Sequence, residues 1–201
     1  MFGKFFLPGP TEVRPEILAA QTRAMIGHRG KAMEELIASL TPGLQYVFRT
    51  TRPVYISSSS ATGLMEAAVR NGARRKVLSL VNGAFSERFH RIAVACGLEA
   101  DVLEVPLGEG HSPEMLEHAL HRADYDAVTV VHSETSTGVL NPVAELAKVT
   151  HARGDVVLLV DSVTGIAGSP VETDAWELDF VLTGSQKAFA LPPGLAFGVA
   201  R

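Results

Sequence analysis

Short runs of β-branched and apolar residues alternate with helical patterns from about residue 53 to the end of the chain. No other pattern in the sequence limits the fold so strongly, because strands separated by helices pair in parallel and need helices on both faces to bury them. The run 156–160, VVLLV, is typical of a central strand. The predicted strands are residues 54–57, 76–81, 100–105, 127–132, 155–161, 179–183 and 195–200.

Helices are predicted between these strands and before the first of them. The segment 112–114, SPE, combines an N-cap residue, a proline and an acidic residue, so it predicts a helix to about residue 122. Further helices are expected after residues 60, 83 and 142. Before the sheet, one helix is expected from Pro15 to about Met25 and another over 32–48, with a break or kink at Pro42.

The size and composition favour one large α/β domain. With 201 residues, 46% of them hydrophobic, the chain can bury a sizeable core, and no repeat or linker divides it. We expect a single domain over 1–201, with N-terminal helices over about 1–50 and the sheet over 51–201. The net charge of -4 gives no electrostatic reason to expect nucleic acid or an anionic membrane, so small molecules are the expected partners and no metal is expected.

The cysteine content and the start of the chain favour the cytoplasm. Cys96 is the one cysteine, so no internal disulfide can form, which is compatible with a reducing compartment. The apolar start, residues 1–7, is cut short by Pro8 and Pro10 and is not expected to be a signal peptide or a membrane anchor.

Polar segments follow several predicted strands, at the edge where parallel sheets bind ligands. The segment 57–63, SSSSATG, opens a helix and offers hydroxyls, free N–H groups and a helix dipole, a combination that suits a phosphate. A serine-rich helix cap without a ligand explains this segment at least as well. No G-x-G-x-x-G is present, which disfavours a dinucleotide.

Three further residues each have a functional and an ordinary interpretation. Asp161 ends the most apolar strand and needs a cationic or donating partner there, unless it only caps the turn at Ser162. Lys187 lies in a hydroxyl-bearing loop after another strand and could act as an amine nucleophile, although a solvated lysine is commoner. Phe85 could cover a planar ligand or be an ordinary hydrophobic residue at a helix start.

Together these groups match one kind of chemistry. A phosphate cradle, an aromatic cover, a buried carboxylate and a nucleophilic lysine are what pyridoxal 5'-phosphate (PLP) requires of a protein. A carboxylate keeps the ring nitrogen protonated, and a lysine amine holds the cofactor as a Schiff base and then moves the α-proton of the substrate. The sequence therefore predicts a PLP enzyme with Lys187 and Asp161 as catalytic residues.

Six segments spread over essentially the whole chain resemble the alanine–glyoxylate and serine–pyruvate aminotransferases of aminotransferase class V. The most specific is SQKA followed by PPG, in which Lys187 lies 26 positions after Asp161. The resemblance implies the large domain of a fold-type-I PLP-dependent transferase, with a mostly parallel sheet covered on both faces, and a site at a homodimer interface. The segments are LPGPT (7–11), GHR (27–29), ATGLMEAA (61–68), ETSTG (134–138), VDSV (160–163) and GSQKA (184–188).

The resemblance also implies roles for individual residues. The segment 8–10 and His28 match loops near the substrate pocket. The implied cofactor contacts are the phosphate turn Ser60, Ala61 and Thr62, the ring-stacking Phe85, a hydroxyl near the ring from Ser136, the ring-nitrogen partner Asp161, the opposite ring face at Val163, the phosphate contact Gln186 and the Schiff-base Lys187.

The chain departs from its relatives in three places. Ala61 stands where many have glycine, Phe85 replaces the commoner tryptophan, and the chain ends at Arg201, before a small C-terminal domain that supplies their arginine for the substrate carboxylate. The expected reaction is transamination between alanine or serine and glyoxylate or pyruvate, with the exact donor and acceptor left open. Residues 1–201 alone are expected to bind PLP weakly and to turn over poorly.

Other functions stay open. A PLP lyase such as a cysteine desulfurase needs a reactive cysteine, but Cys96 is expected to be buried late in a helix, and Phe85 stands where desulfurases carry histidine. A truncated, non-catalytic PLP-binding domain is another alternative. A nucleotide-binding α/β domain without PLP is disfavoured by the missing glycine fingerprint.

Overall fold

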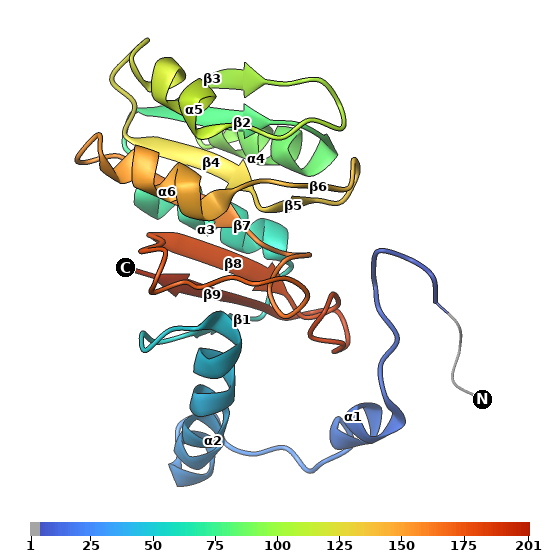
Figure 1. Cartoon of the computed structure of the whole chain (residues 1–201). Helices are drawn as coiled ribbons and strands as arrows, with labels where there is room; N and C mark the ends of the chain where they lie inside the picture. The colour runs from blue at the N-terminus through green and yellow to red at the C-terminus, as the bar shows by residue number, and fades with distance from the viewer. Residues whose placement is uncertain (1–4) are drawn as a thin grey trace.

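The computed structural model describes residues 5–201, so residues 1–4 of the apolar start lie outside it. Seven strands form one sheet in the order β1-β9-β8-β7-β4-β2-β3 (Figure 1). From β3 to β8 neighbouring strands run parallel, whereas β9 is antiparallel to both β8 and β1, so the mostly parallel sheet is confirmed. The strands are β1 (Tyr55–Ser57), β2 (Lys76–Val81), β3 (Glu99–Glu104), β4 (Ala127–Val131), β7 (Val157–Asp161), β8 (Phe180–Gly184) and β9 (Ala196–Ala200).

Helices cover both faces of the sheet (Figure 1). One face carries α3 (Ala61–Gly72) and α4 (Ala84–Ala95), and the other carries α5 (Pro113–Leu120) and α6 (Val143–His151). Successive strand residues point to opposite faces, so Leu158 packs with α5 and α6 while Leu159 packs with α3 and α4. Burial on both faces explains why the sequence of β7 is apolar without alternation.

The N-terminal helices lie beside the sheet rather than on it (Figure 1). They are α1 (Pro15–Ala20) and α2 (Lys31–Phe48), and of these only Phe48 is buried in the core. The predicted end of α1 near residue 25 is wrong, because none of its residues is buried and no packing extends so short a helix. Of the break or kink predicted at Pro42, the break is wrong and the kink stays a prediction: α2 continues through Pro42, since the carbonyl that this proline leaves unbonded lies on an exposed turn.

A short hairpin, which the sequence did not predict, extends the carboxyl end of β4. It consists of β5 (Ser133–Glu134) and β6 (Val139–Leu140); the ETSTG segment begins at the end of β5 and forms the turn, residues 135–138. The hairpin lies against the start of α4, where the site described below is formed.

Over residues 5–201, no helix is long and apolar enough to cross a membrane. The division of the chain near residue 50 stays a prediction.

Candidate active site

The carboxyl ends of β4, β7 and β8 meet beside the first turns of α3 and α4. A cavity of about 220 Å³ lies at this edge. The fold therefore gathers most of the predicted cofactor contacts, which come from segments far apart in the chain, around one space. Eight of the nine predicted cofactor-binding residues line it: Ser60, Ala61, Thr62, Phe85, Asp161, Val163, Gln186 and Lys187.

The first turn of α3 supplies a polar end to the cavity. Ser60 is the N-cap residue, and its hydroxyl makes no capping hydrogen bond to the helix. The backbone amides of Ala61 and Thr62 have no hydrogen-bond acceptor within residues 5–201. Gln186 lies next to this turn, since a methyl group on Gly184 would come 2.8 Å from its Oε1 and 3.5 Å from the Cβ atom of Ala61. Free amides and a hydroxyl at a helix start form a site suited to a phosphate.

Asp161 ends β7 with its side chain almost fully buried, at 1% exposed. Its Oδ1 accepts the amide of Val163 (2.8 Å), and within residues 5–201 no other hydrogen bond and no ion pair reaches the carboxylate. Burial raises the pKa of Asp161 to about 7; the Val163 bond, Arg88 and Lys187 lower it only in part, and the charge of Glu134 adds to the rise. A cationic donor bound in the cavity would compensate this carboxylate, and a protonated ring nitrogen is such a donor.

Lys187 follows β8 and faces the same cavity. Burial lowers the pKa of Lys187, although the charge of Asp161 opposes the shift, so the neutral amine is more available than in a solvated lysine. Its Nζ donates a 2.9 Å hydrogen bond to the carbonyl of Pro8. Thr11 binds the same loop, because its hydroxyl donates to the Lys187 carbonyl (2.7 Å) and its amide to that of Gln186 (2.8 Å). The N-terminal segment therefore lies against Lys187, whereas its role near a substrate pocket stays a prediction.

Phe85 lies in the first turn of α4, half-buried at the side of the cavity. The guanidinium of Arg88, one turn further along, lies 5.1 Å from the centre of its ring. Val163 also lines the cavity and packs against the core under α3 and α4. An aromatic ring and a branched aliphatic side chain are the kinds of surface that enclose a flat ring from two sides.

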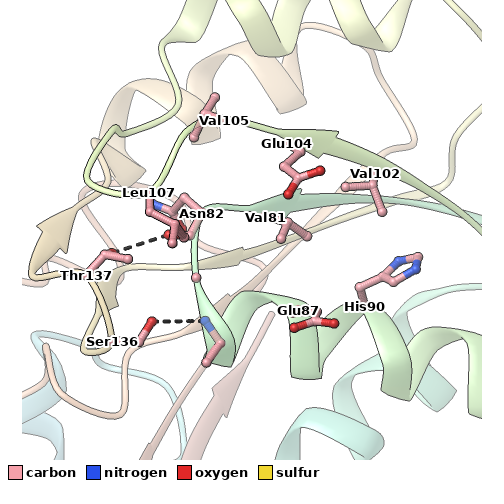
Figure 2. Close-up of a pocket in the computed structure, with 12 residues that line it drawn as sticks. Val81, Asn82, Glu87, His90, Val102, Glu104, Val105, Leu107, Ser136 and Thr137 are labelled. Atoms are coloured by element: carbon pink, nitrogen blue, oxygen red, sulfur yellow. Dashed lines mark hydrogen bonds between the residues drawn. The ribbon is translucent and has the colours of Figure 1, made fainter.

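Ser136 is the one predicted cofactor contact that the structure does not place in this cavity. Its hydroxyl donates to Glu134 (2.7 Å) and accepts the amide of Ala84 (2.9 Å), so it is bound to the start of α4. Figure 2 shows Ser136 and Thr137 on the wall of a different hollow, of about 520 Å³, over β2 and β3. In the same hairpin it is Thr135 that lines the cavity, where it donates to the Thr164 hydroxyl (3.1 Å).

Several lining residues were missed by the sequence reasoning. His28 lies in an exposed hollow at the start of α2 and does not line this cavity, so its place near a substrate pocket stays a prediction. Ser133 and Thr135 could have been found as polar residues that closely follow a strand. Met65 and Arg88 could have been found because each lies one helical turn after a predicted site residue, Ala61 or Phe85. The missed residues are Met65, Arg88, Val131, Ser133, Thr135 and Thr164.

A family model, that of aminotransferase class-V, matches residues 26–200. The chain belongs to this family. Among the curated members, an uncharacterized aminotransferase of Methanocaldococcus jannaschii is 41% identical over 94% of this chain and 50% of its own length. The serine–glyoxylate aminotransferase of Methylorubrum extorquens is 36% identical, over 94% of this chain and 49% of its own length. The class V chain described here thus spans about half the length of the curated relatives it matches.

Solved structures place the fold in the same family. The alanine–glyoxylate aminotransferase of Nostoc sp. superposes with a TM-score of 0.92 at 32% identity, over 96% of this class V chain and 52% of that chain. The cysteine desulfurase of Thermococcus onnurineus reaches a TM-score of 0.74 at 16% identity and shares the fold alone. The predicted fold, the large domain of a fold-type-I aminotransferase, is confirmed.

Proposed function

We propose that this chain is the cofactor-binding part of a PLP-dependent class V aminotransferase. The observation that carries the proposal is Asp161, a buried carboxylate with a single hydrogen bond that faces the same cavity as Lys187. A buried carboxylate without a cation is costly, so its presence beside a lysine and a free helix start calls for a cationic ligand with an anionic tail. PLP has both of these groups and an aldehyde that a lysine amine can bind.

The described residues fit the cofactor group by group. Bound there, PLP would withdraw electrons from the substrate Cα and make its proton acidic. The residues that would hold it are Ser60, Ala61, Thr62 and Gln186 at the phosphate, Phe85 and Val163 at the two ring faces, Asp161 at the ring nitrogen and Lys187 at the aldehyde carbon.

Lys187 and Asp161 have separate chemical tasks in this proposal. The Lys187 amine is the group placed to hold the cofactor and then, once free, to take up and return the α-proton. Its lowered pKa favours the neutral, basic form. Asp161 keeps the donor bound to it protonated, and that donor in turn holds the carboxylate ionised although burial alone would protonate it.

The proposed substrates are alanine or serine as amino donor and glyoxylate or pyruvate as acceptor. The names of two relatives, a serine–glyoxylate and an alanine–glyoxylate aminotransferase, support this choice. The test is formation of glycine from glyoxylate with alanine or serine as donor and PLP present. Because residues 1–201 alone are expected to turn over poorly, even slow glycine formation with these donors, abolished by Lys187→Ala, supports the proposal. Formation with phosphoserine or bulky amino acids alone would contradict the proposed substrates.

A lyase of the desulfurase kind is not favoured by the position of the cysteine. Cys96 is the C-cap residue of α4, half-buried against the core under α3 and α4, and it does not line the cavity. No thiol in residues 5–201 is therefore placed to attack a substrate bound there. A non-catalytic PLP-binding domain differs from the proposal in one result, which is PLP bound at Lys187 without any glycine formed.

We also propose a homodimer that works in the cytoplasm. The resemblance supports the dimer, and so do the large apolar side chains that α2 leaves exposed, namely Leu36, Ile37 and Leu40. The single cysteine supports a reducing compartment. Sedimentation of the purified chain at the mass of a monomer, at concentrations well above the assay range, would contradict the dimer.

A further inference from the structure

Glu134 is a fully buried carboxylate, 0% exposed, in the hairpin beside the cavity. One of its oxygens, Oε2, accepts the backbone amides of Phe85 (3.1 Å) and Ser86 (2.9 Å) and the Ser86 hydroxyl (3.0 Å). All three donors belong to the first turn of α4, where a helix offers free N–H groups and the positive end of its dipole. The carboxylate therefore fixes the start of α4 to the hairpin.

The second oxygen, Oε1, extends this connection through Ser136. It accepts the Ser136 amide (3.1 Å) and hydroxyl (2.7 Å), and the same hydroxyl accepts the amide of Ala84 (2.9 Å). Figure 2 shows the Ser136 hydroxyl pointing at the first turn of α4. Both carboxylate oxygens thus bind groups that belong to, or hold, this one helix turn.

The side chains of Glu134 and Ser136 lie so close to the start of α4 that the residue before the helix has to be a glycine. A methyl group on Gly83 would lie 2.5 Å from the Cγ atom of Glu134 and would also collide with the Ser136 hydroxyl. Gly83 has an extended backbone that any residue can adopt, so space, not conformation, is the reason for glycine here.

Glu134 is ionised at neutral pH. Burial by itself raises the pKa of its carboxyl, but the hydrogen bonds from Ser136 and Ser86 outweigh burial and lower the pKa below its ordinary value. The charge reaches the cavity as well, because it contributes to the raised pKa of Asp161. Glu134 itself does not line the cavity, so any effect on a ligand is exerted through its neighbours.

We propose that Glu134 is a positioning residue of the cofactor site, whose carboxylate fixes the first turn of α4 and thereby holds the Phe85 ring where the cofactor ring stacks. The inference rests on the proposed function, since it needs a flat ring bound in the cavity. A role in folding alone would make the same hydrogen bonds, so the test compares Glu134 with a second buried carboxylate that has no connection to the cavity.

Asp126 provides that matched control. Its side chain is buried, and it accepts the backbone amides of Arg74 (3.1 Å) and Arg75 (2.8 Å). These residues precede β2 and β4, at the opposite edge of the sheet from the cavity. Asp126→Asn therefore removes a charge from a similar backbone-binding carboxylate without touching the site.

The experiment measures PLP affinity and the visible circular dichroism of bound PLP in the purified chain, beside urea unfolding without PLP. Glu134→Gln is expected to raise the Kd for PLP about tenfold and to weaken the dichroism band, because the charge and one of the two acceptor oxygens are lost and the first turn of α4, with Phe85, is held less firmly. Asp126→Asn is expected to lower stability and to leave the Kd and the band unchanged. Ser86→Ala removes one of the three donors to Oε2, together with the acceptor of the Asn82 amide (3.0 Å), and is expected to raise the Kd two- to threefold, which keeps the test open if Glu134→Gln does not fold.

Two outcomes overturn the inference. An unchanged Kd and band in Glu134→Gln, or in Ser86→Ala where only that variant folds, would reduce Glu134 to a structural role while the proposed function stands. Absence of PLP binding in the unaltered chain would remove the proposed function, and this inference with it.

Discussion

The amine of Lys187 donates a 2.9 Å hydrogen bond to the carbonyl of Pro8, a residue 179 positions earlier in the chain. Gly9 follows, and a methyl group there would lie 2.5 Å from the lysine Nζ and 2.6 Å from its Cδ. The N-terminal segment thus packs directly on the Lys187 side chain. Gly9, which lies against that side chain, has no side chain of its own. The position of the reactive amine depends on this segment as well as on β8.

Gly9→Ala is expected to raise the Kd for PLP about tenfold or more, because the added methyl displaces the Lys187 side chain. The control is Gly108→Ala. Both glycines have a positive φ, +146° and +94°, so both variants carry backbone strain, but a methyl group on Gly108 meets no atom within 4 Å. Equal PLP affinity in the two variants, measured by titration of the visible absorbance, would contradict the contact with Lys187.

Asp161→Asn is expected to stabilise the cofactor-free chain at neutral pH. Burial raises the folded-state pKa of Asp161 to about 7 from an ordinary 3.8, so between these values only the unfolded chain ionises, and the free energy of unfolding falls as pH rises. The asparagine removes this loss, which is on the order of 4 kcal/mol when complete. Urea unfolding from about pH 4 to about pH 8 checks it, and parallel profiles for variant and parent would contradict it. The same variant is expected to bind PLP more weakly.

Asp174→Asn serves as a control, because the pKa of Asp174 is shifted in the opposite direction and the variant is expected to change stability with the opposite sign. Burial raises the pKa of Asp174, but hydrogen bonds from Thr50, Thr51 and Arg52 outweigh it and lower the pKa to about 2. This stabilisation is complete above the unfolded pKa and is lost as pH falls toward 2. Asp174→Asn is therefore expected to lower the free energy of unfolding at neutral pH, without a change in PLP affinity.

The start of α3 can be tested with two forms of the cofactor. Ser60→Ala with Thr62→Ala is expected to weaken binding of PLP about tenfold and to leave binding of pyridoxal, which lacks the phosphate, unchanged. Ser58→Ala, an exposed neighbour outside the cavity lining, is the control. A similar loss of affinity for both compounds would show that these hydroxyls do not bind the phosphate.

The sheet and the meeting of Asp161 with Lys187 could be predicted from local signals, whereas the contacts of Val163 and Gln186 were expected only from the family resemblance. The run VVLLV was identified as a central strand because a strand buried on two faces must be apolar throughout. Asp161 and Lys187 were then expected to meet, because the carboxyl ends of parallel strands share one edge. Nothing in these arguments required knowledge of how distant segments pack.

What the sequence did not predict depends on tertiary packing. Thr135, not Ser136, lines the cavity: both lie in the turn of the hairpin, where no strand alternation sets the direction of a side chain, and Ser136 is bound to the start of α4 instead. The role of Glu134 arises from contacts with residues 48 and 49 positions earlier, which no local pattern specifies. The length of α1 and the continuity of α2 through Pro42 likewise depend on exposure, which the sequence does not reveal.

The measurement that tests the central claim most directly is the position of the cofactor bond. The purified chain is mixed with PLP, reduced with borohydride, digested and mapped by mass spectrometry. The account predicts a pyridoxyl group on Lys187, and none in a Lys187→Ala variant that still folds. A pyridoxyl group on Lys4, Lys31, Lys76 or Lys148 instead, or unmodified protein at saturating PLP, would contradict it.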